Sequence, residues 1–225
     1  MSDAGIERLG EDALLLRLGD SVDASTNLRV HRLAESIAAR RPPWLVDLVP
    51  AYASLAVFVD PAHFDAGVDP LVEPGRWLAD CAEASAVAGD GGGALIEIPV
   101  RYGGEDGPDL DAVAAEAGMS PREAVALHCA GDYRVAMLGF APGFPYLIGL
   151  DPRLATPRLA TPRPRVPAGS VGIGGAQTGI YPRSGPGGWR LIGRTDLRLF
   201  DATRDPPATL SPGDRVRFVP VGGSR

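Results

Sequence analysis

The sequence predicts an α+β protein with a small ferredoxin-like α/β domain, followed by a domain of short β-strands that closes as a barrel or sandwich. In the first 88 residues, apolar residues recur at strand spacing and then at helix spacing. Further along, the chain is rich in proline and glycine, which permits short strands and irregular loops. The flexible run GDGGG at 89–93 separates the two regions. We therefore expect domains over residues 1–88 and 89–225.

The first domain is expected to contain a strand, a helix, two strands and a second helix. Residues 11–18 have the character of a strand, and a helical apolar stripe then continues until Pro42 stops it. Residues 44–49 and 54–59 form a strand pair, and Trp77 lies on the apolar face of the second helix. A ferredoxin-like sheet needs one more strand than this order supplies.

The second domain is expected to begin with a strand at 94–101 and two short helices at 109–117 and 120–128. The motif SPRE at 120–123 is a capping box with proline at the first helical position, which fixes the start of the second helix. The repeated pentapeptide RLATP at 153–162 is expected to be an extended, polyproline-like loop. Further strands are predicted at 133–140, 165–173, 179–181, 189–193 and 215–219.

Charge is distributed unevenly along the chain. The net charge is −6, which disfavours nucleic acid as a partner, yet residues 151–198 contain eight arginines and two acidic residues. This stretch suits an anion or an acidic partner. Every basic side chain is arginine, since the chain has no lysine, and this excludes a Schiff-base lysine and a Walker A motif.

No segment has the length and apolar character of a membrane span, and the N-terminal residues lack the layout of a signal peptide. Cys81 and Cys129 lie far apart without the spacing of a metal site, so we expect two reduced thiols and no metal. These features predict a cytoplasmic protein.

Three features could carry chemistry. His128 can act as a base or proton shuttle, or cap the end of its helix, and the residues alone favour the cap. The loop GFAPGFPYL at 139–147 displays aromatic faces that suit a small planar ligand. The glycine-rich segment 165–182 lets backbone N–H groups approach a ligand closely, although glycine-rich barrel turns are also common. The candidate binding residues are Phe140, Pro142, Phe144, Tyr146, Arg165, Ser170, Gln177, Thr178 and Tyr181.

Five motifs resemble one family. They are GFAPGFPYL (139–147), ATPR (160–163), RVPAGSVGI (165–173), QTGIYP (177–182) and PGGWRLIGRT (186–195), and they resemble the KipI family, the B-type component of 5-oxoprolinase, also called allophanate hydrolase subunit 1. The resemblance covers nearly the whole chain. It implies a small α/β domain followed by a cyclophilin-like β-barrel.

The resemblance also implies a function. Members of this family work with a C-type component (KipA or allophanate hydrolase subunit 2 type) and an A-type component (LamB/YcsF type) to open 5-oxoproline to glutamate with ATP, which we expect to be held together with a partner. His128 would then assist proton transfer, while Gln177, Thr178 and the 139–146 loop shape the pocket. The chain contains no complete set of nucleophile, base and oxyanion donors, so we expect no activity from it alone.

Other functions remain open. One family member is an inhibitor of a sporulation histidine kinase, and the name allophanate hydrolase implies action on a urea carboxylate, although the amidase glycine-serine signature and catalytic lysine are missing here. Residues 111–128 mimic a helix-turn-helix, but Arg122 is the one cation of the recognition helix, too little for phosphate contacts.

Overall fold

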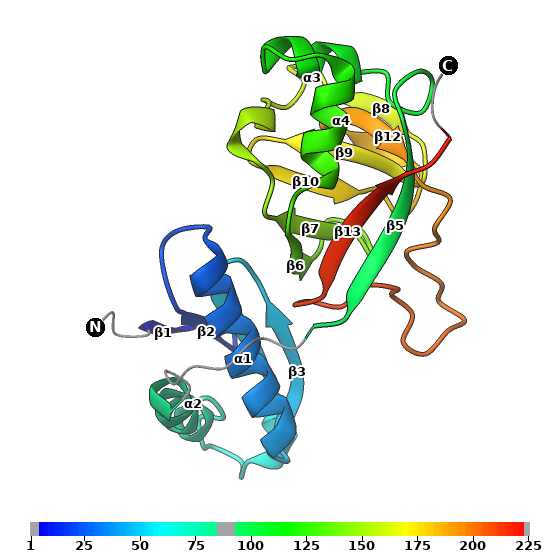
Figure 1. The fold of residues 1–225 in the computed structure, drawn as a ribbon. Helices are drawn as coiled ribbons and strands as arrows, with labels where there is room; N and C mark the ends of the chain where they lie inside the picture. Colours follow the sequence, from blue (N-terminus) through cyan, green and yellow to red (C-terminus); the bar gives the residue numbers. More distant parts are fainter. Residues whose placement is uncertain (1–4, 85–92, 223–225) are drawn as a thin grey trace. The chain divides into compact units, whose positions relative to one another are not determined.

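The computed structural model describes residues 5–84 and 93–222. The chain divides into two compact units, Met1–Gly92 and Gly93–Arg225 (Figure 1). The predicted boundary between residues 88 and 89 lies outside the described residues. No helix among the described residues is long and apolar enough to cross a membrane.

The first unit is a four-stranded antiparallel sheet with two helices. Its sheet order is β1-β2-β4-β3, and the missing strand is β1, which forms a hairpin with β2. This strand occupies the edge that the last strand of a ferredoxin-like sheet would take. The elements of the unit are β1 (Gly5–Arg8), β2 (Ala13–Arg17), α1 (Ala24–Arg40), β3 (Leu45–Pro50), β4 (Ser54–Val59), the 3₁₀ turn η1 (Pro61–His63) and α2 (Val72–Ala84).

Local chemistry explains the long helix of this unit. Asp23 caps the N-terminus of α1 by accepting a hydrogen bond from the Thr26 amide. Val30, Leu33 and Ile37 are completely buried on one face of the helix, as its periodicity predicts. The apolar core of the first unit is therefore formed between this face and the inner face of the sheet.

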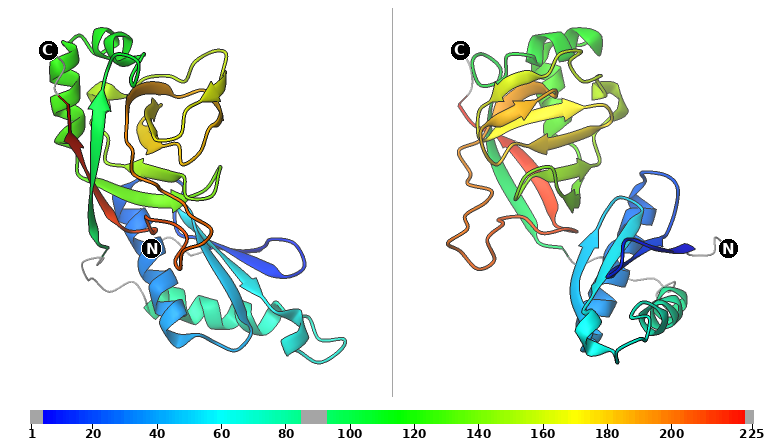
Figure 2. Two further views of the ribbon diagram at one scale, coloured as in Figure 1. Left: turned by 90° about the vertical axis from the view of Figure 1, so that its right-hand side faces the viewer. Right: turned by 180° about the vertical axis from the view of Figure 1, so that it is seen from behind.

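The second unit contains a closed seven-stranded barrel in the order β10-β7-β6-β13-β5-β12-β9 (Figures 1 and 2). β5 and β13 pair in parallel, and the other neighbours in the barrel are antiparallel. The α+β class and the β-barrel of the second unit are confirmed. The barrel strands are β5 (Leu95–Tyr102), β6 (Tyr133–Leu138), β7 (Pro145–Ile148), β9 (Ser170–Gly174), β10 (Gln177–Ile180), β12 (Arg190–Arg194) and β13 (Arg215–Pro220).

Two short helices pack on the barrel. They are α3 (Leu110–Glu116), which contacts β12, and α4 (Pro121–Cys129), which contacts β13 (Figure 1). The predicted capping box is present, with Ser120 and Glu123 each bonded to the other's backbone. His128 on α4 is fully buried against the barrel, whereas Pro121, Arg122 and Glu123 at the start of the helix are exposed.

Three predictions about the Pro/Gly-rich region need correction. The 139–147 segment is not wholly irregular, because its end forms β7. The strand predicted at 165–173 is two strands, β8 (Arg163–Val166) and β9, because the turn at 167–169 includes a proline and Gly169 with φ +80°. The first RLATP copy contains a 3₁₀ turn, η2 (Pro152–Leu154), in place of extended backbone. β8 pairs with β11 (Gly185–Gly187) in a separate two-stranded sheet, and β11 was not predicted.

Candidate functional site

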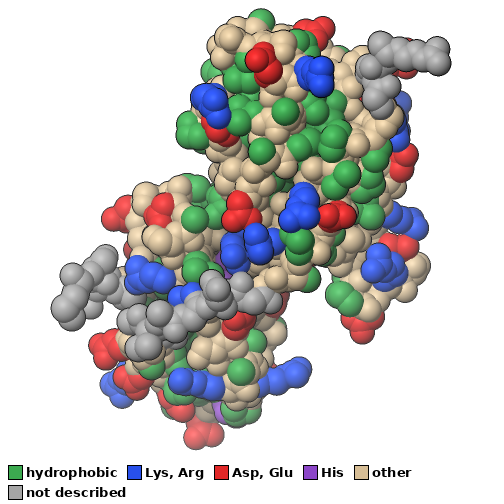
Figure 3. Space-filling view, in the orientation of Figure 1, with side chains coloured by type: hydrophobic (Ala, Val, Ile, Leu, Met, Phe, Trp, Pro, Cys, Tyr) green, Lys and Arg blue, Asp and Glu red, His purple; other side chains and the backbone are tan. Residues whose placement is uncertain are grey.

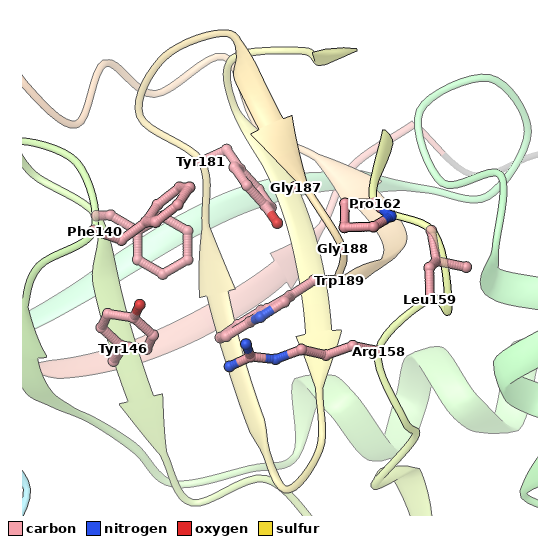
Figure 4. Close-up of a pocket in the computed structure, with 10 residues that line it drawn as sticks. Phe140, Tyr146, Arg158, Leu159, Pro162, Tyr181, Gly187, Gly188 and Trp189 are labelled. Atoms are coloured by element: carbon pink, nitrogen blue, oxygen red, sulfur yellow. The ribbon is translucent and has the colours of Figure 1, made fainter. Parts of the chain in front are cut away.

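An aromatic pocket lies on the second unit, where β7, β10 and β11 meet the 157–162 loop. Figure 4 shows Phe140 and Tyr146 on one side of it, with Tyr181 and Trp189 across from them. Its cavity volume is about 160 Å³. The lining residues are Phe140, Phe144, Tyr146, Arg158, Leu159, Pro162, Tyr181, Gly187, Gly188 and Trp189.

Phe144 organises the aromatic side chains of the pocket. Its ring centroid lies 4.9 Å from that of Tyr146, 5.2 Å from Tyr181 and 5.5 Å from Trp189. The contacts with Tyr181 and Trp189 are edge-to-face, a favoured geometry for aromatic pairs. Phe144, Tyr181 and Trp189 are 2%, 3% and 5% exposed, so they form a buried wall of the pocket, while Phe140 and the half-buried Tyr146 offer most of the aromatic surface.

Phe140 is held in a strained turn at the mouth of the pocket. Its φ is +64°, and the Ala141 amide donates to the Gly139 carbonyl across it at 2.7 Å, which closes a rare three-residue γ-turn. The ring is 64% exposed, although its centroid lies 5.4 Å from that of Phe144. The chain thus holds a large apolar group toward solvent at a cost in backbone energy.

The glycines of the 165–182 segment make room for Trp189. A Cβ on Gly174 would lie 2.5 Å from the Trp189 ring, and one on Gly179 would lie 3.0 Å from it. Their role was predicted to be close backbone approach to a ligand. The structure corrects this for these two positions, because the space is filled by an aromatic side chain of the protein itself.

Arg158 runs alongside Trp189, with its guanidinium on the side of the pocket where Tyr146 lies (Figure 4). Its Cζ lies 5.8 Å from the Trp189 ring centroid, a cation–π contact. The backbone on both sides of Arg158 is tied down, because the Pro157 carbonyl accepts from Arg190 Nε at 3.3 Å and the Leu159 amide donates to Gly188 at 2.7 Å.

Burial raises the pKa of Tyr181 above its ordinary value of 10.0. A backbone hydrogen bond with Trp189 and the positive charge of Arg158 oppose this shift. Tyr181 therefore keeps a neutral hydroxyl at physiological pH, which accepts from the Trp189 backbone and can still donate a hydrogen bond.

Half of the arginines in the 151–198 stretch already have acidic partners. The Arg163 guanidinium donates to Asp109 at 2.8 Å, and the other carboxylate oxygen of this buried aspartate accepts from the Leu191 amide at 2.7 Å. The remaining pairs are Arg153 with Asp151, Arg194 with Asp106 and Arg198 with Asp201. Within the described ranges, Arg158, Arg165, Arg183 and Arg190 have no ion pair. The stretch is less available to an external anion than its composition suggested.

His128 lies inside the barrel and does not line the pocket. Tyr102 bonds to its Nδ1 at 2.8 Å, and its Nε2 bonds to Thr178 Oγ1 at 3.1 Å. Thr178 in turn donates to the Gly172 carbonyl at 3.0 Å, which leaves its oxygen to accept from a protonated Nε2. Complete burial lowers the pKa of His128 from 6.5 to about 3. This geometry favours a neutral structural histidine over both the predicted proton transfer and a charged helix cap.

Four of the predicted binding residues come together in the pocket: Phe140, Phe144, Tyr146 and Tyr181. The others lie elsewhere. Pro142 lines a shallow hollow formed by its own turn, Arg165 is exposed on β8, Ser170 and Thr178 are buried in barrel strands, and Gln177 is half-buried at the start of β10.

Sequence reasoning missed Arg158 and Trp189 as site residues. Both belong to patterns that had been noticed, the RLATP repeat and the PGGWRLIGRT motif. The glycines before Trp189 were a usable signal, because Gly187 and Gly188 also line the pocket. For Arg158 the available signal was the residue two positions earlier, where Thr156 stands in place of the Asp151 that precedes Arg153.

A second hollow of about 520 Å³ lies on the same unit, lined by Tyr102, Leu110, Pro121, Arg122, Val125, Pro220, Val221 and Gly222. Figure 3 shows hydrophobic side chains gathered on the face that carries α4, β5 and β13. The hydroxyl of Tyr102 is committed to His128, which leaves Arg122 as the polar side chain available to orient a ligand. The aromatic pocket is therefore the better candidate site.

Comparison with known proteins identifies the family. Residues 4–210 match the family "Carboxyltransferase domain, subdomain C and D". The chain is 44% identical to the 5-oxoprolinase B subunit of Bacillus subtilis (strain 168), over 96% of this chain and 92% of that protein. The chain belongs to this family of 5-oxoprolinase B subunits, as the motifs predicted.

Other family members resemble the chain to a similar degree. The 5-oxoprolinase B subunit of Escherichia coli O157:H7 is 46% identical, with 94% of each protein covered. The crystal structure of TTHA0988 matches with 42% identity and a TM-score of 0.78 over 94% of this chain. The chain spans only 40% of the TTHA0988 chain, so in that protein the same fold is joined to a longer polypeptide.

Proposed function

We propose that the chain is a non-autonomous subunit of an ATP-dependent 5-oxoprolinase, which opens 5-oxo-L-proline to L-glutamate together with partners of the A and C types. Three curated relatives at 44–48% identity are named as B subunits of 5-oxoprolinase, and proteins named in this way work in an assembly. In this proposal the enzyme acts in the cytoplasm.

The aromatic pocket is the feature from which we infer the role of this chain. Its cavity of about 160 Å³ is smaller than the roughly 300–1,000 Å³ of a complete ligand pocket. Its rings offer flat apolar faces at which a five-membered lactam can pack, and the neutral Tyr181 hydroxyl can bond to the lactam amide. The described lining residues include no serine, cysteine, histidine or carboxylate. The chain therefore binds and orients the ring, and a partner supplies the reacting groups.

The pocket does not fit ATP. Arg158 is the one cation among the lining residues to offset the phosphate charges, and the chain has no lysine. The cavity is also too small for a nucleoside triphosphate. We therefore propose that a partner protein binds ATP.

The exposed ring of Phe140 suits contact with a partner. A strained turn holds it at the pocket mouth, and exposed aromatic side chains are typical anchors of protein interfaces. A partner that covers Phe140 would also complete the wall of the pocket and exclude water from the ring.

The test is reconstitution. The purified chain is combined with its A-type and C-type partners, and glutamate formed from 5-oxoproline is measured with and without ATP. We expect ATP-dependent glutamate from the three proteins together and none from this chain alone. Full assembly without any glutamate would overturn the proposal.

A urea-type amide is the second candidate substrate. The urea amidolyase of Saccharomyces cerevisiae is 32% identical over 50% of this chain, which covers 6% of that protein. Turnover of allophanate in place of 5-oxoproline by the reconstituted complex would favour this alternative.

A further inference from the structure

We propose that Arg158 is the specificity-determining residue of the aromatic pocket, and that it selects a small ring bearing a carboxylate by binding that carboxylate. This inference deepens the proposed function and rests on it for the identity of the ring.

The two copies of the RLATP repeat show that Arg158 is unusual. Arg153 begins the first copy and donates to both carboxylate oxygens of Asp151, at 3.0 and 2.8 Å. Arg158 begins the second copy, and no acidic side chain among the described residues pairs with it. The residue two positions before each arginine explains the difference, because Asp151 neutralises Arg153, whereas Thr156 leaves the charge of Arg158 available.

Arg158 is also preorganised. Hydrogen bonds tie its two neighbours, Pro157 and Leu159, to the segment that carries Trp189, and the guanidinium itself packs on the indole. An arginine held in this way loses less conformational freedom when it binds an anion than a free surface arginine does. Its planar fork can donate two parallel hydrogen bonds to a carboxylate.

The charge of the pocket decides which ligands fit. Aromatic pockets often bind cations through the faces of their rings, but the guanidinium of Arg158 repels a second positive charge. The cavity of about 160 Å³ admits a small molecule only. A flat or nearly flat ring can pack on Trp189 and Tyr146, with an attached carboxylate directed at Arg158. Uncharged lactams satisfy the first contact and lack the second.

The experiment measures binding to the assembled complex by isothermal titration calorimetry. The probes are 5-oxoproline and 2-pyrrolidinone, the same lactam ring without the carboxylate. We expect Arg158→Met to weaken 5-oxoproline binding by about 10- to 100-fold, the usual value of charge-assisted hydrogen bonds, and to leave 2-pyrrolidinone binding unchanged. Arg158→Lys keeps the positive charge without the planar guanidinium, so its affinity for 5-oxoproline should lie between those of the wild type and Arg158→Met.

Arg153→Met is the matched control, because it removes the corresponding arginine of the other repeat copy and should change neither affinity. Thermal unfolding of each variant checks that the fold is intact. Equal loss of affinity for both probes, or unchanged affinity for 5-oxoproline in Arg158→Met, would overturn the inference.

Measuring glutamate formation in the same variants distinguishes a failure of this inference from a failure of the proposed function. Binding of 5-oxoproline that depends on Arg158, without glutamate formation, would support the inference and contradict the proposed function. Turnover that is insensitive to Arg158→Met would leave the function standing and overturn the inference. Absence of 5-oxoproline binding to the wild-type complex would overturn both.

Discussion

The barrel unit contains two clusters of aromatic and polar side chains that differ in access to solvent. In the cluster around His128, the side chains of His128, Tyr133 and Thr178 are fully buried and the polar atoms bond to one another. In the aromatic pocket, Phe140 is 64% exposed and Arg158 is exposed without an acidic partner in the described chain. A closed and satisfied cluster stabilises a fold, whereas an open cluster with an available charge is suited to bind.

The largest expected effect comes from His128→Ala. The substitution removes a buried ring and leaves Tyr102 and Thr178 without their partner, so we expect the free energy of unfolding to fall by about 3–5 kcal/mol. Chemical denaturation of the isolated chain measures it. If the cluster is purely structural, the folded fraction keeps the kcat of the wild-type complex. A stable variant with lost kcat would restore His128 to the mechanism.

The pH dependence of stability gives the next effect. Folded His128 has a pKa of about 3, against 6.5 without burial, so between these values the unfolded state binds the additional proton. The contribution of the neutral, buried His128 to the free energy of unfolding is fully present above pH 6.5. It is lost as the pH falls toward 3, by up to about 1.4 kcal/mol per pH unit.

Denaturation of wild type and His128→Asn at pH 6.5 and pH 5 isolates this contribution, because both proteins share every other titrating group. The stability of the wild type should fall more steeply than that of the variant, by about 1.6 kcal/mol over this range, because the full slope is reached only below pH 6.5. Parallel pH profiles would show that His128 is accessible or charged in the fold.

A smaller effect on stability is expected at the floor of the aromatic pocket, where Trp189 lies. In Gly174→Ala the new Cβ would lie 2.5 Å from the Trp189 ring, so the indole must move. We expect a loss of about 1–2 kcal/mol in stability and a rise in KM for the lactam. The control is Gly185→Ala, where no heavy atom lies within 4 Å of the added Cβ. An unchanged KM in Gly174→Ala would remove Trp189 from ligand binding.

The smallest effect on stability concerns Phe140. Phe140→Gly should relieve the positive φ and stabilise the isolated chain by about 0.5–1 kcal/mol, whereas Phe140→Ala keeps the strain. Both variants lose the ring, so both should assemble less tightly with the partner proteins. Native mass spectrometry reports the assembly, and wild-type assembly of both variants would show that Phe140 is not an interface anchor.

The sequence predicted the elements whose signals are local. The helical stripe of Val30, Leu33 and Ile37 and the capping box at Ser120 were both found where predicted. The position of β1 at the edge of its sheet was not predictable from a local signal, because a strand's pairing partner depends on the whole sheet. β7 was missed because Pro145 at its start disfavours a strand, yet proline is tolerated at the first residue of one.

The site was only partly predictable for the same reason. The aromatic loop and Tyr181 were found from composition, and the pocket brings them together. Gln177, Thr178 and Ser170 were expected at the site and do not line the pocket, because the direction of a side chain in a barrel strand depends on register and not on residue type. The sequence does distinguish Arg153 from Arg158, because Asp151 lies two residues before the first and Thr156 two residues before the second, but the contact of Arg158 with Trp189 depends on tertiary structure.

We propose that the aromatic pocket holds the lactam and that a partner protein covers it. The most direct measurement is a crystal structure of the assembled complex with 5-oxoproline bound. We expect the lactam ring to pack on the exposed faces of Trp189 and Tyr146, its carboxylate to lie on Arg158, and a partner protein to pack against Phe140. A lactam bound entirely within the partner proteins, with this pocket open to solvent, would contradict it.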